Sequence, residues 1–239
     1  MKKRKGIRAY KDWFFGLKRK NLLNHAAAVF NRKGYHGTTI SDIARQVGVS
    51  PSALYYYVKD KQQVLFECNR MSLDLAMDAL KTACATAATP EARLELALRG
   101  QIETVTDELQ GCVVLIEEEA LSKRHRKEII KRRDEYERAL RGLIQEGIEQ
   151  KVFIQCDPKI VGFVFLGAIN WMPKWYSAKG EFPPREIARL FAHQLVRSIL
   201  VSPKDSPILP CDTTGRILGD SRRSEKTAQK AELLLEGNQ

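Results

Sequence analysis

The stretch TTISDIARQVGVSPSALYYYVKDK, residues 38–61, predicts two short helices joined by a tight turn. Thr39 and Asp42 have the spacing of a capping box, in which a hydroxyl and a carboxylate bind the free backbone N–H groups at a helix start. The first of these helices is therefore expected to open near Ser41. Its apolar residues recur at three- and four-residue spacing and so share one face: Ile40, Ile43, Ala44 and Val47.

The sequence also predicts the turn and the start of the second helix. Gly48 can adopt the left-handed conformation that ends a helix, because it has no Cβ atom to clash. Ser50 is a favourable N-cap, and Pro51 is a favourable first helical residue because an N–H at that position would have no partner. A glycine after one helix and a proline inside the next are typical of a helix-turn-helix.

The second helix is expected to have one face that points away from the core. With Leu54 and Val58 inward, a rotation of about 100° per residue turns other side chains outward. The three tyrosines could instead pack half-buried against neighbouring helices. The short helix, whose core side is already filled, and the basic surroundings favour an exposed face that approaches the major groove of DNA. The outward residues are Ser52, Ala53, Tyr55 and Tyr56, with Tyr57 on the flank.

These residues resemble the DNA-binding signature of the TetR family of bacterial regulators. The signature T-T-I-x-D-I-A-x-x-x-G-V-S-x-x-x-L-Y-x-Y-x-x-x-K extends here from Thr38 to Lys61. The resemblance implies that Thr39 starts the helix before the turn. It implies base contacts for Pro51, Ser52, Ala53 and Tyr56, and phosphate contacts, or packing beside them, for Tyr55, Tyr57 and Lys61. Thr38, Thr39 and Ser50 complete the candidate DNA-binding set. Because Pro51 and Ala53 have no hydrogen-bonding side chain, direct readout of bases is expected to be sparse.

The positive charge of the chain is concentrated around this motif. The 239 residues include 40 Lys and Arg and 29 Asp and Glu, a net charge of +11. Residues 1–61 hold fourteen Lys and Arg against three Asp, so they carry the whole excess and residues 62–239 sum to zero. Neutralising phosphates with such cations, with release of counterions, supplies much of the affinity of proteins for DNA. We therefore expect a double-stranded DNA operator as a partner.

The remaining composition excludes several classes of protein. No run approaches the roughly 18 apolar residues of a membrane span, and the N-terminus lacks the apolar stretch of a signal peptide, so a cytoplasmic location without membrane contact is expected. The five cysteines have no C-x-x-C spacing and the four histidines no metal-ligand spacing. There is no Gly-rich phosphate loop, paired-carboxylate spacing or nucleophile motif. The sequence thus predicts no catalytic residues, no metal, no cofactor and no enzyme activity.

Apolar residues recur at helical spacing through the chain and no segment alternates like a strand, so the predicted fold is all-α. We expect a basic arm at 1–16, a helix-turn-helix DNA-binding domain at 17–61, a helical effector-binding and dimerisation domain at 62–201, and a disordered tail at 202–239. A fourth helix that begins near Lys61 is expected to link the two domains, because one end lies at the DNA-binding domain and the other enters the second domain.

A homodimer is expected from two apolar helices in the second domain. The segment that follows Pro158 is apolar on every side of a helical wheel, so one side needs cover from outside its own domain. A second, amphipathic helix is predicted from Pro184 to Leu200. Two such helices from each of two subunits would form a four-helix interface. The second helices of the two helix-turn-helix motifs, one from each subunit, would then lie about 34 Å apart and fit a palindromic operator.

A candidate site for a small-molecule effector lies where Pro173 breaks the apolar helix. An amide, a lysine and several aromatic residues gather there, as in a mostly apolar pocket with a few polar groups. Taken singly, these residues could equally be core aromatics and an amide that caps the backbone. The candidate effector-binding residues are Phe163, Asn170, Trp171, Lys174, Trp175 and Tyr176.

The segment from Gly147 to Leu200, with its N-W-x-x-K-W-Y-x-x-x-G motif, resembles TetR-type regulators that respond to acyl-coenzyme A thioesters. This resemblance implies that Trp171 and Trp175 line the acyl or adenine region and that Lys174 binds a phosphate or carbonyl. The resulting expectation is a repressor that its effector releases from DNA. Another lipophilic effector and a DNA-binding dimer without any effector are the alternatives.

Overall fold

The computed structural model describes residues 19–106, 118–177 and 179–201. The predicted basic arm at 1–16 and the predicted tail at 202–239 lie outside these residues. Apart from an isolated bridge between Phe153 and Leu200, the described residues form helices, with no strand among them. The prediction of an all-α fold is confirmed.

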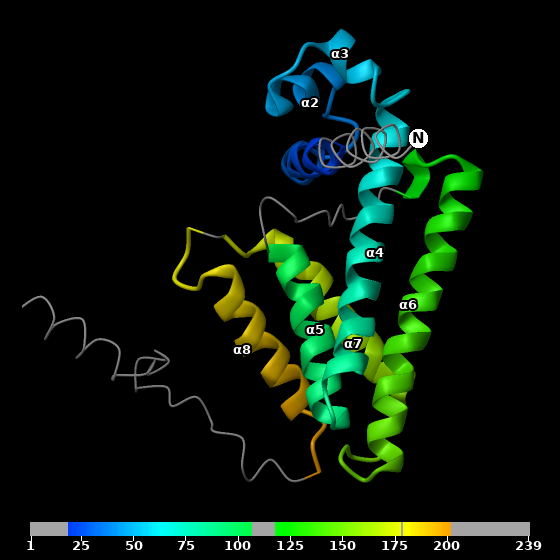
Figure 1. The fold of residues 1–239 in the computed structure, drawn as a ribbon, viewed down its shortest axis with the longest axis vertical. Helices are drawn as coiled ribbons and strands as arrows, with labels where there is room; N and C mark the ends of the chain where they lie inside the picture. The colour runs from blue at the N-terminus through cyan, green and yellow to red at the C-terminus, as the bar shows by residue number, and fades with distance from the viewer. Residues whose placement is uncertain (1–18, 107–117, 178, 202–239) are drawn as a thin grey trace, which may run out of the picture. The chain divides into compact units, whose positions relative to one another are not determined.

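Three helices form the helix-turn-helix module (Figure 1). The chain is helical over residues 19–33, α2 spans Ile40–Val47 and α3 spans Pro51–Tyr55. Gly48 follows α2 with a φ of 79°, the left-handed conformation that was predicted for it. The helix before the turn begins at Ile40, one residue earlier than expected, because Thr39 itself is the N-cap.

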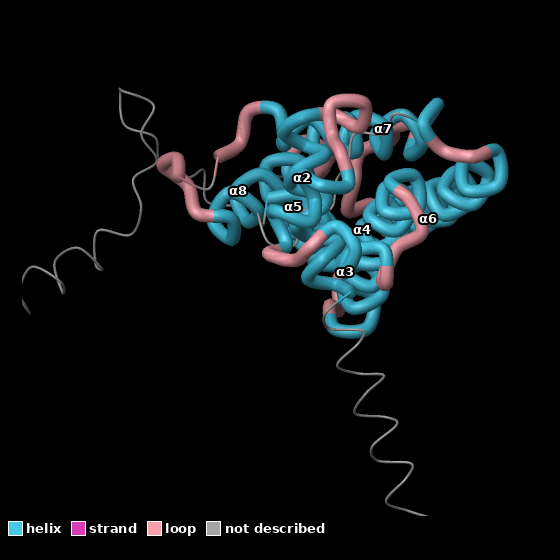
Figure 2. The backbone as a smooth tube through the Cα atoms, turned by 90° about the horizontal axis from the view of Figure 1, so that it is seen from above, coloured by secondary structure: helices cyan, strands magenta, loops and turns pink. Residues whose placement is uncertain are grey.

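Five further helices follow in the described chain, and α5 packs between α4 and α8 while α7 lies against α6 (Figures 1 and 2). Two short 3-10 turns stand before α6 and after α7. The helices are α4 at Lys61–Thr86, α5 at Pro90–Thr106, α6 at Lys123–Glu149, α7 at Pro158–Trp171 and α8 at Pro184–Arg197, with the 3-10 turns at Glu118–Ala120 and Met172–Lys174.

The helix α4 contributes to both hydrophobic cores of the described chain. Its first half, including Val64 and Leu65, packs with Phe30, Ile43 and Leu54 of the helix-turn-helix module. The second half packs with residues of α5, α6, α7 and α8 in a larger core, through Ala76, Leu80 and Ala83. The predicted link between the DNA-binding module and the second domain is therefore one continuous helix of 26 residues.

The C-terminal part of α6 needs a glycine for its packing. A Cβ atom at Gly147 would overlap the ring of Phe153, which is 1% exposed. At Gly142 of the same helix, nothing lies within 4 Å of a built Cβ atom. Gly147 is thus a position of close approach between α6 and the chain that follows it.

The apolar helix α7 buries only one of its faces in this chain. Phe165 and Ile169 are buried, whereas Ile160, Val164 and Trp171 are more than half exposed. The sequence predicted a helix that is buried all round, and the single chain does not cover the second face. Among the described residues no helix combines the length and apolar composition that crossing a membrane requires.

Candidate functional site

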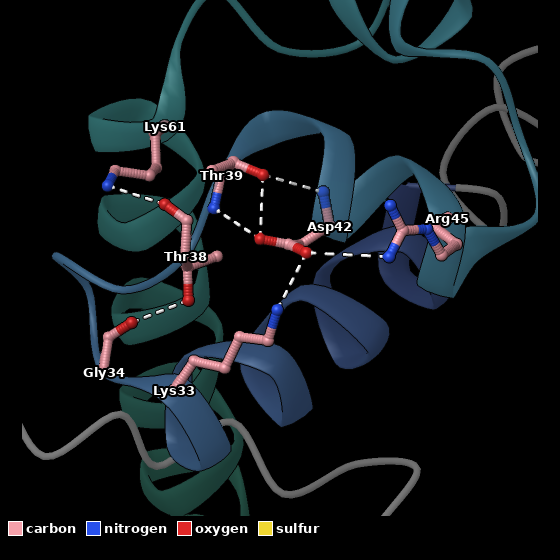
Figure 3. A network of polar contacts seen from close by, with 7 residues as sticks. All are labelled: Lys33, Gly34, Thr38, Thr39, Asp42, Arg45 and Lys61. Carbon is pink, nitrogen blue, oxygen red and sulfur yellow. Dashed lines mark hydrogen bonds and ion pairs between the residues drawn. The ribbon is translucent and has the colours of Figure 1, made fainter.

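Thr39 and Asp42 form the predicted capping box at the start of α2 (Figure 3). The Asp42 backbone N–H donates to Thr39 Oγ1 at 3.1 Å, and the Thr39 backbone N–H donates to Asp42 Oδ2 at 3.0 Å. Lys33 Nζ donates to Asp42 Oδ1 at 2.8 Å. The hydrogen bonds from Lys33 and then Thr39 hold the pKa of Asp42 well below its usual value. Asp42 therefore stays a carboxylate that ties α2 to the preceding helix.

Thr38 and Lys61 hold the segment at 34–38, which precedes α2 (Figure 3). Thr38 is 1% exposed, and its hydroxyl donates to Gly34 O at 2.6 Å. Lys61 Nζ donates to Tyr35 O at 2.7 Å and to Thr38 O at 2.8 Å, and it lies 4.2 Å from the centroid of the Tyr35 ring. Two of the three ammonium N–H groups are thus bound within the protein. Both side chains position the module, whatever contacts the third N–H makes.

The face of α3 that was predicted to point outward is exposed. Ser50 caps the helix, since its Oγ accepts from Ala53 N at 3.1 Å, and Leu54 is completely buried. Tyr55 is 56% and Tyr56 78% exposed, whereas Tyr57 is half-buried and packs against the core of the module. Small side chains continue the exposed surface at Pro51, Ser52 and Ala53. The helical-wheel prediction is confirmed for exposure, and contact with DNA stays a prediction.

A cavity of about 680 Å³ lies between α4, α5, α6 and α7. Its volume is within the range of about 300–1,000 Å³ that small-molecule sites have. Apolar side chains from three helices line it, among them Leu73, Ala76, Val105, Phe163 and Leu166. Asn69, Ser72, Leu73 and Ala76 come from α4, so the helix that enters the helix-turn-helix module also forms a wall of the cavity.

The deep end of the cavity is polar but uncharged. Asn69, Gln101 and Tyr136 are 4%, 7% and 3% exposed and come from α4, α5 and α6. The Tyr136 hydroxyl donates to Gln101 Oε1 at 2.7 Å, and Asn69 Nδ2 donates to Leu65 O at 2.9 Å. Burial raises the pKa of Tyr136, so its phenol stays protonated.

Charged side chains gather at the rim of the cavity. Four cations line it: Arg133, Arg138, Arg141 and Lys159. They are accompanied by Asp134 and Glu137, and Arg141 Nε lies 3.8 Å from Glu137 Oε1. The rim therefore has an excess of positive charge over an apolar interior, which suits a ligand with an anionic part and an apolar part.

Two of the six predicted effector residues line this cavity, namely Phe163 and Asn170. The other four do not: Trp171 ends α7 and is 61% exposed, and Lys174, Trp175 and Tyr176 lie in or after the turn at Met172–Lys174. The Trp175 ring packs against Tyr176 and Phe191, and the Tyr176 hydroxyl donates to Phe182 O at 3.1 Å.

Sequence reasoning missed the walls of the cavity that α4, α5 and α6 supply. A polar residue on an otherwise apolar helix face could have indicated these walls. Asn69 and Gln101 are such residues, because the positions near them in α4 and α5 are buried. Within the described ranges no three His, Cys, Asp or Glu side chains come together to hold a metal ion.

Two family models match the chain. Residues 22–68 match the model of bacterial regulatory proteins of the tetR family, and residues 87–199 match a tetracyclin repressor-like C-terminal domain. The chain is similar to the HTH-type transcriptional repressor KstR2 of Mycolicibacterium smegmatis, with 25% identity over 193 residues that cover 79% of this chain and 93% of that protein.

Two solved structures are similar along most of their length. The TetR family transcriptional regulator PfmR from Thermus thermophilus is 29% identical with a TM-score of 0.65, over 74% of this chain and 97% of that one. AibR in complex with isovaleryl coenzyme A and operator DNA is 25% identical with a TM-score of 0.64, over 77% of this chain and 98% of that one.

Proposed function

The chain belongs to the TetR family of bacterial transcriptional regulators, and from this premise we propose that it is a homodimeric, cytoplasmic repressor. It binds a palindromic operator through α3 and leaves the operator when a small molecule occupies the cavity. The observation that carries the proposal is α4, which packs in the core of the helix-turn-helix module and also lines the cavity. In this proposal residues 17–61 form the DNA-binding domain, and residues 62–201 form the effector-binding and dimerisation domain.

The DNA-binding end of the proposal is supported by shape and charge. The exposed face of α3 carries small residues first and then Tyr55 and Tyr56, so the start of the helix can approach a groove closely. The excess positive charge of residues 1–61 supplies attraction to phosphates. Of the other candidate DNA-binding residues, Thr38, Thr39, Ser50 and Lys61 act by positioning α2 and α3.

The dimer is supported by the uncovered face of α7. Val164 and Trp171 are 59% and 61% exposed, and they continue an apolar surface with Ile160 and Phe163. Burying such a surface against its copy, with α8 beside it, would remove it from water and set the distance between the two reading helices.

An acyl-coenzyme A thioester fits the cavity in chemical terms. Its acyl chain would occupy the apolar interior, and its phosphates would meet the cations Arg138 and Lys159 at the rim. AibR, a similar protein, is known with isovaleryl coenzyme A and operator DNA bound. Another lipophilic anion is the competing effector, and a dimer without any effector is the second alternative.

The protein has one arrangement that binds DNA and another that does not. Release requires the effector to have a higher affinity for the second arrangement than for the first. Since Asn69, Ser72 and Leu73 stand on α4, a ligand that displaces them tilts this helix. The tilt moves α3, because Leu54 packs in the same core as the first half of α4.

The proposal is tested by release of DNA. A labelled duplex with the inverted repeat upstream of the protein's own gene is bound and then titrated with acyl-coenzyme A thioesters of increasing chain length, while fluorescence anisotropy is recorded. We expect at least one thioester to release the duplex at concentrations where free coenzyme A does not. No release by any thioester overturns the proposed class, and native mass spectrometry then shows whether any other ligand co-purifies.

Two variants separate the cavity from the aromatic residues beyond α7. Ser72→Trp fills the cavity from α4 and should abolish release. Trp175→Ala removes a half-exposed ring outside the cavity and should leave release unchanged. The opposite pattern would place the effector at Trp171, Lys174, Trp175 and Tyr176, four of the six residues predicted from sequence.

A further inference from the structure

The deep end of the cavity has hydrogen-bonding capacity that the protein does not use. Tyr136 donates to Gln101 Oε1, which leaves the Gln101 amide nitrogen with two N–H groups. Among the described residues, none accepts from this nitrogen. Gln101 lines the cavity, and its amide nitrogen is not one of the fully enclosed side-chain atoms that lack a partner.

Asn69 adds an acceptor to the lining of the same cavity. Its Nδ2 donates to Leu65 O, one turn earlier in α4, and this bond fixes the amide so that Oδ1 stays available. No described donor reaches Oδ1, and this atom too is not fully enclosed. Three helices thus contribute an amide donor, an amide acceptor and a phenol oxygen to the lining of one cavity, each on a residue that is more than nine-tenths buried.

A purely structural role explains the hydrogen bond between Tyr136 and Gln101, but it does not explain the amide groups that have no partner among the described residues. The bond between Tyr136 and Gln101 does join α5 to α6, but leucine in place of Gln101 would fit the surrounding apolar core, since Leu98, Ile102 and Leu140 are fully buried in the same core. Buried polar groups are costly unless each finds a partner. The unused groups open into the cavity, so the missing partner is water or a ligand.

We propose that the effector carries an oxygen, as a ketone or hydroxyl group, at the far end of its apolar part, and that the Gln101 amide donates a hydrogen bond to it. This inference rests on the proposed function and narrows it: the ligand is an oxygenated acyl thioester, not a saturated one. A ligand hydroxyl group that reaches Asn69 could instead donate to its Oδ1. A saturated chain of the same length would displace water from Gln101 and leave the amide without a partner, which lowers affinity by about 5- to 100-fold.

The test compares matched ligands. Octanoyl-coenzyme A and a set of oxo-octanoyl-coenzyme A thioesters, with the ketone at successive carbons, are titrated into the full-length protein by isothermal calorimetry. At least one oxo derivative should bind about 5-fold or more tightly than octanoyl-coenzyme A. Equal affinity of all members overturns the inference and leaves the acyl thioester class standing. No binding by any member overturns both.

Variants assign the preference to the polar end. Gln101→Met keeps the length of the side chain and removes the donor, so the preference for the oxo derivative should fall to less than about 2-fold while octanoyl-coenzyme A binds at least as well. Gln145→Met, at an exposed position of α6, is the matched control and should keep the preference. If Gln101→Met fails to fold, Tyr136→Phe removes the O–H that orients the amide and should weaken the preference too. A preference that survives in both variants refutes the role of Gln101.

Discussion

Replacing Tyr56 with alanine tests whether α3 is the helix that reads DNA. Tyr56 is 78% exposed and stands at the C-cap of α3 with right-handed helical angles, so alanine fits its backbone without strain. Because little of the side chain is buried, the free energy of unfolding should change by no more than about 0.5 kcal/mol. Any large loss of DNA binding would then reflect the lost contact and not the loss of the fold.

The size of that loss follows from the contacts that one tyrosine can make. A specific contact with a base contributes about 1–3 kcal/mol. The proposed dimer would present two copies of Tyr56 to the operator, so the variant should lose about 2–6 kcal/mol, or about 30-fold to 20,000-fold in affinity. The loss for DNA of unrelated sequence should be much smaller, because the cations of residues 1–61 are unchanged.

The assay is fluorescence anisotropy with operator and unrelated duplexes at one salt concentration, together with urea unfolding. Leu96→Ala, an exposed truncation on α5, is the control and should leave both affinities unchanged. Operator affinity within about 3-fold of the original protein, with unfolding unchanged, would show that the exposed face of α3 does not read the operator.

Three further outcomes are expected. Gly147→Ala should lower the free energy of unfolding by about 1–3 kcal/mol, because the added Cβ atom would overlap Phe153. Gly142→Ala in the same helix should be neutral or should stabilise the protein by up to about 1 kcal/mol. Urea unfolding of both variants would measure the difference, and equal effects would refute the close approach at Gly147. Because the pKa of Asp42 is lowered in the folded protein, its contribution to stability is complete above the ordinary aspartate pKa of about 3.9 and is lost as the pH falls below that value. Asp42→Asn should therefore weaken the loss of stability at acid pH, as followed by circular dichroism. An unchanged loss at acid pH would contradict this. Val164→Glu should place a charge on the uncovered face of α7 and shift the protein to monomers in sedimentation experiments, while a stable dimer would move the interface elsewhere.

Local chemistry explains why the helix-turn-helix could be predicted so closely. The capping box of Thr39 and Asp42, the left-handed Gly48 and the N-cap Ser50 act between residues that are close neighbours along the chain. Such interactions depend little on the remaining chain, so their spacing is visible in the sequence. The exposure of Tyr55 and Tyr56 follows from the same short periodicity once Leu54 is placed in the core.

The cavity between α4, α5, α6 and α7 depends on contacts that spacing does not encode. Sequence reasoning collected the aromatic residues near Pro173 because they are neighbours along the chain, yet Trp175, which follows the turn after α7, does not line the cavity. The side chains that form its deep end, Asn69, Gln101 and Tyr136, stand on three helices and are up to 67 positions apart.

The amino-acid sequence by itself determined the all-helical fold, the DNA-reading module and the location of its positive charge, because capping, turn chemistry and helical periodicity are local properties. Only the tertiary structure decided where the cavity lies and which polar groups line it. Packing of α4 to α7 brings distant residues together, and a cavity exists only where side chains from several helices leave space between them.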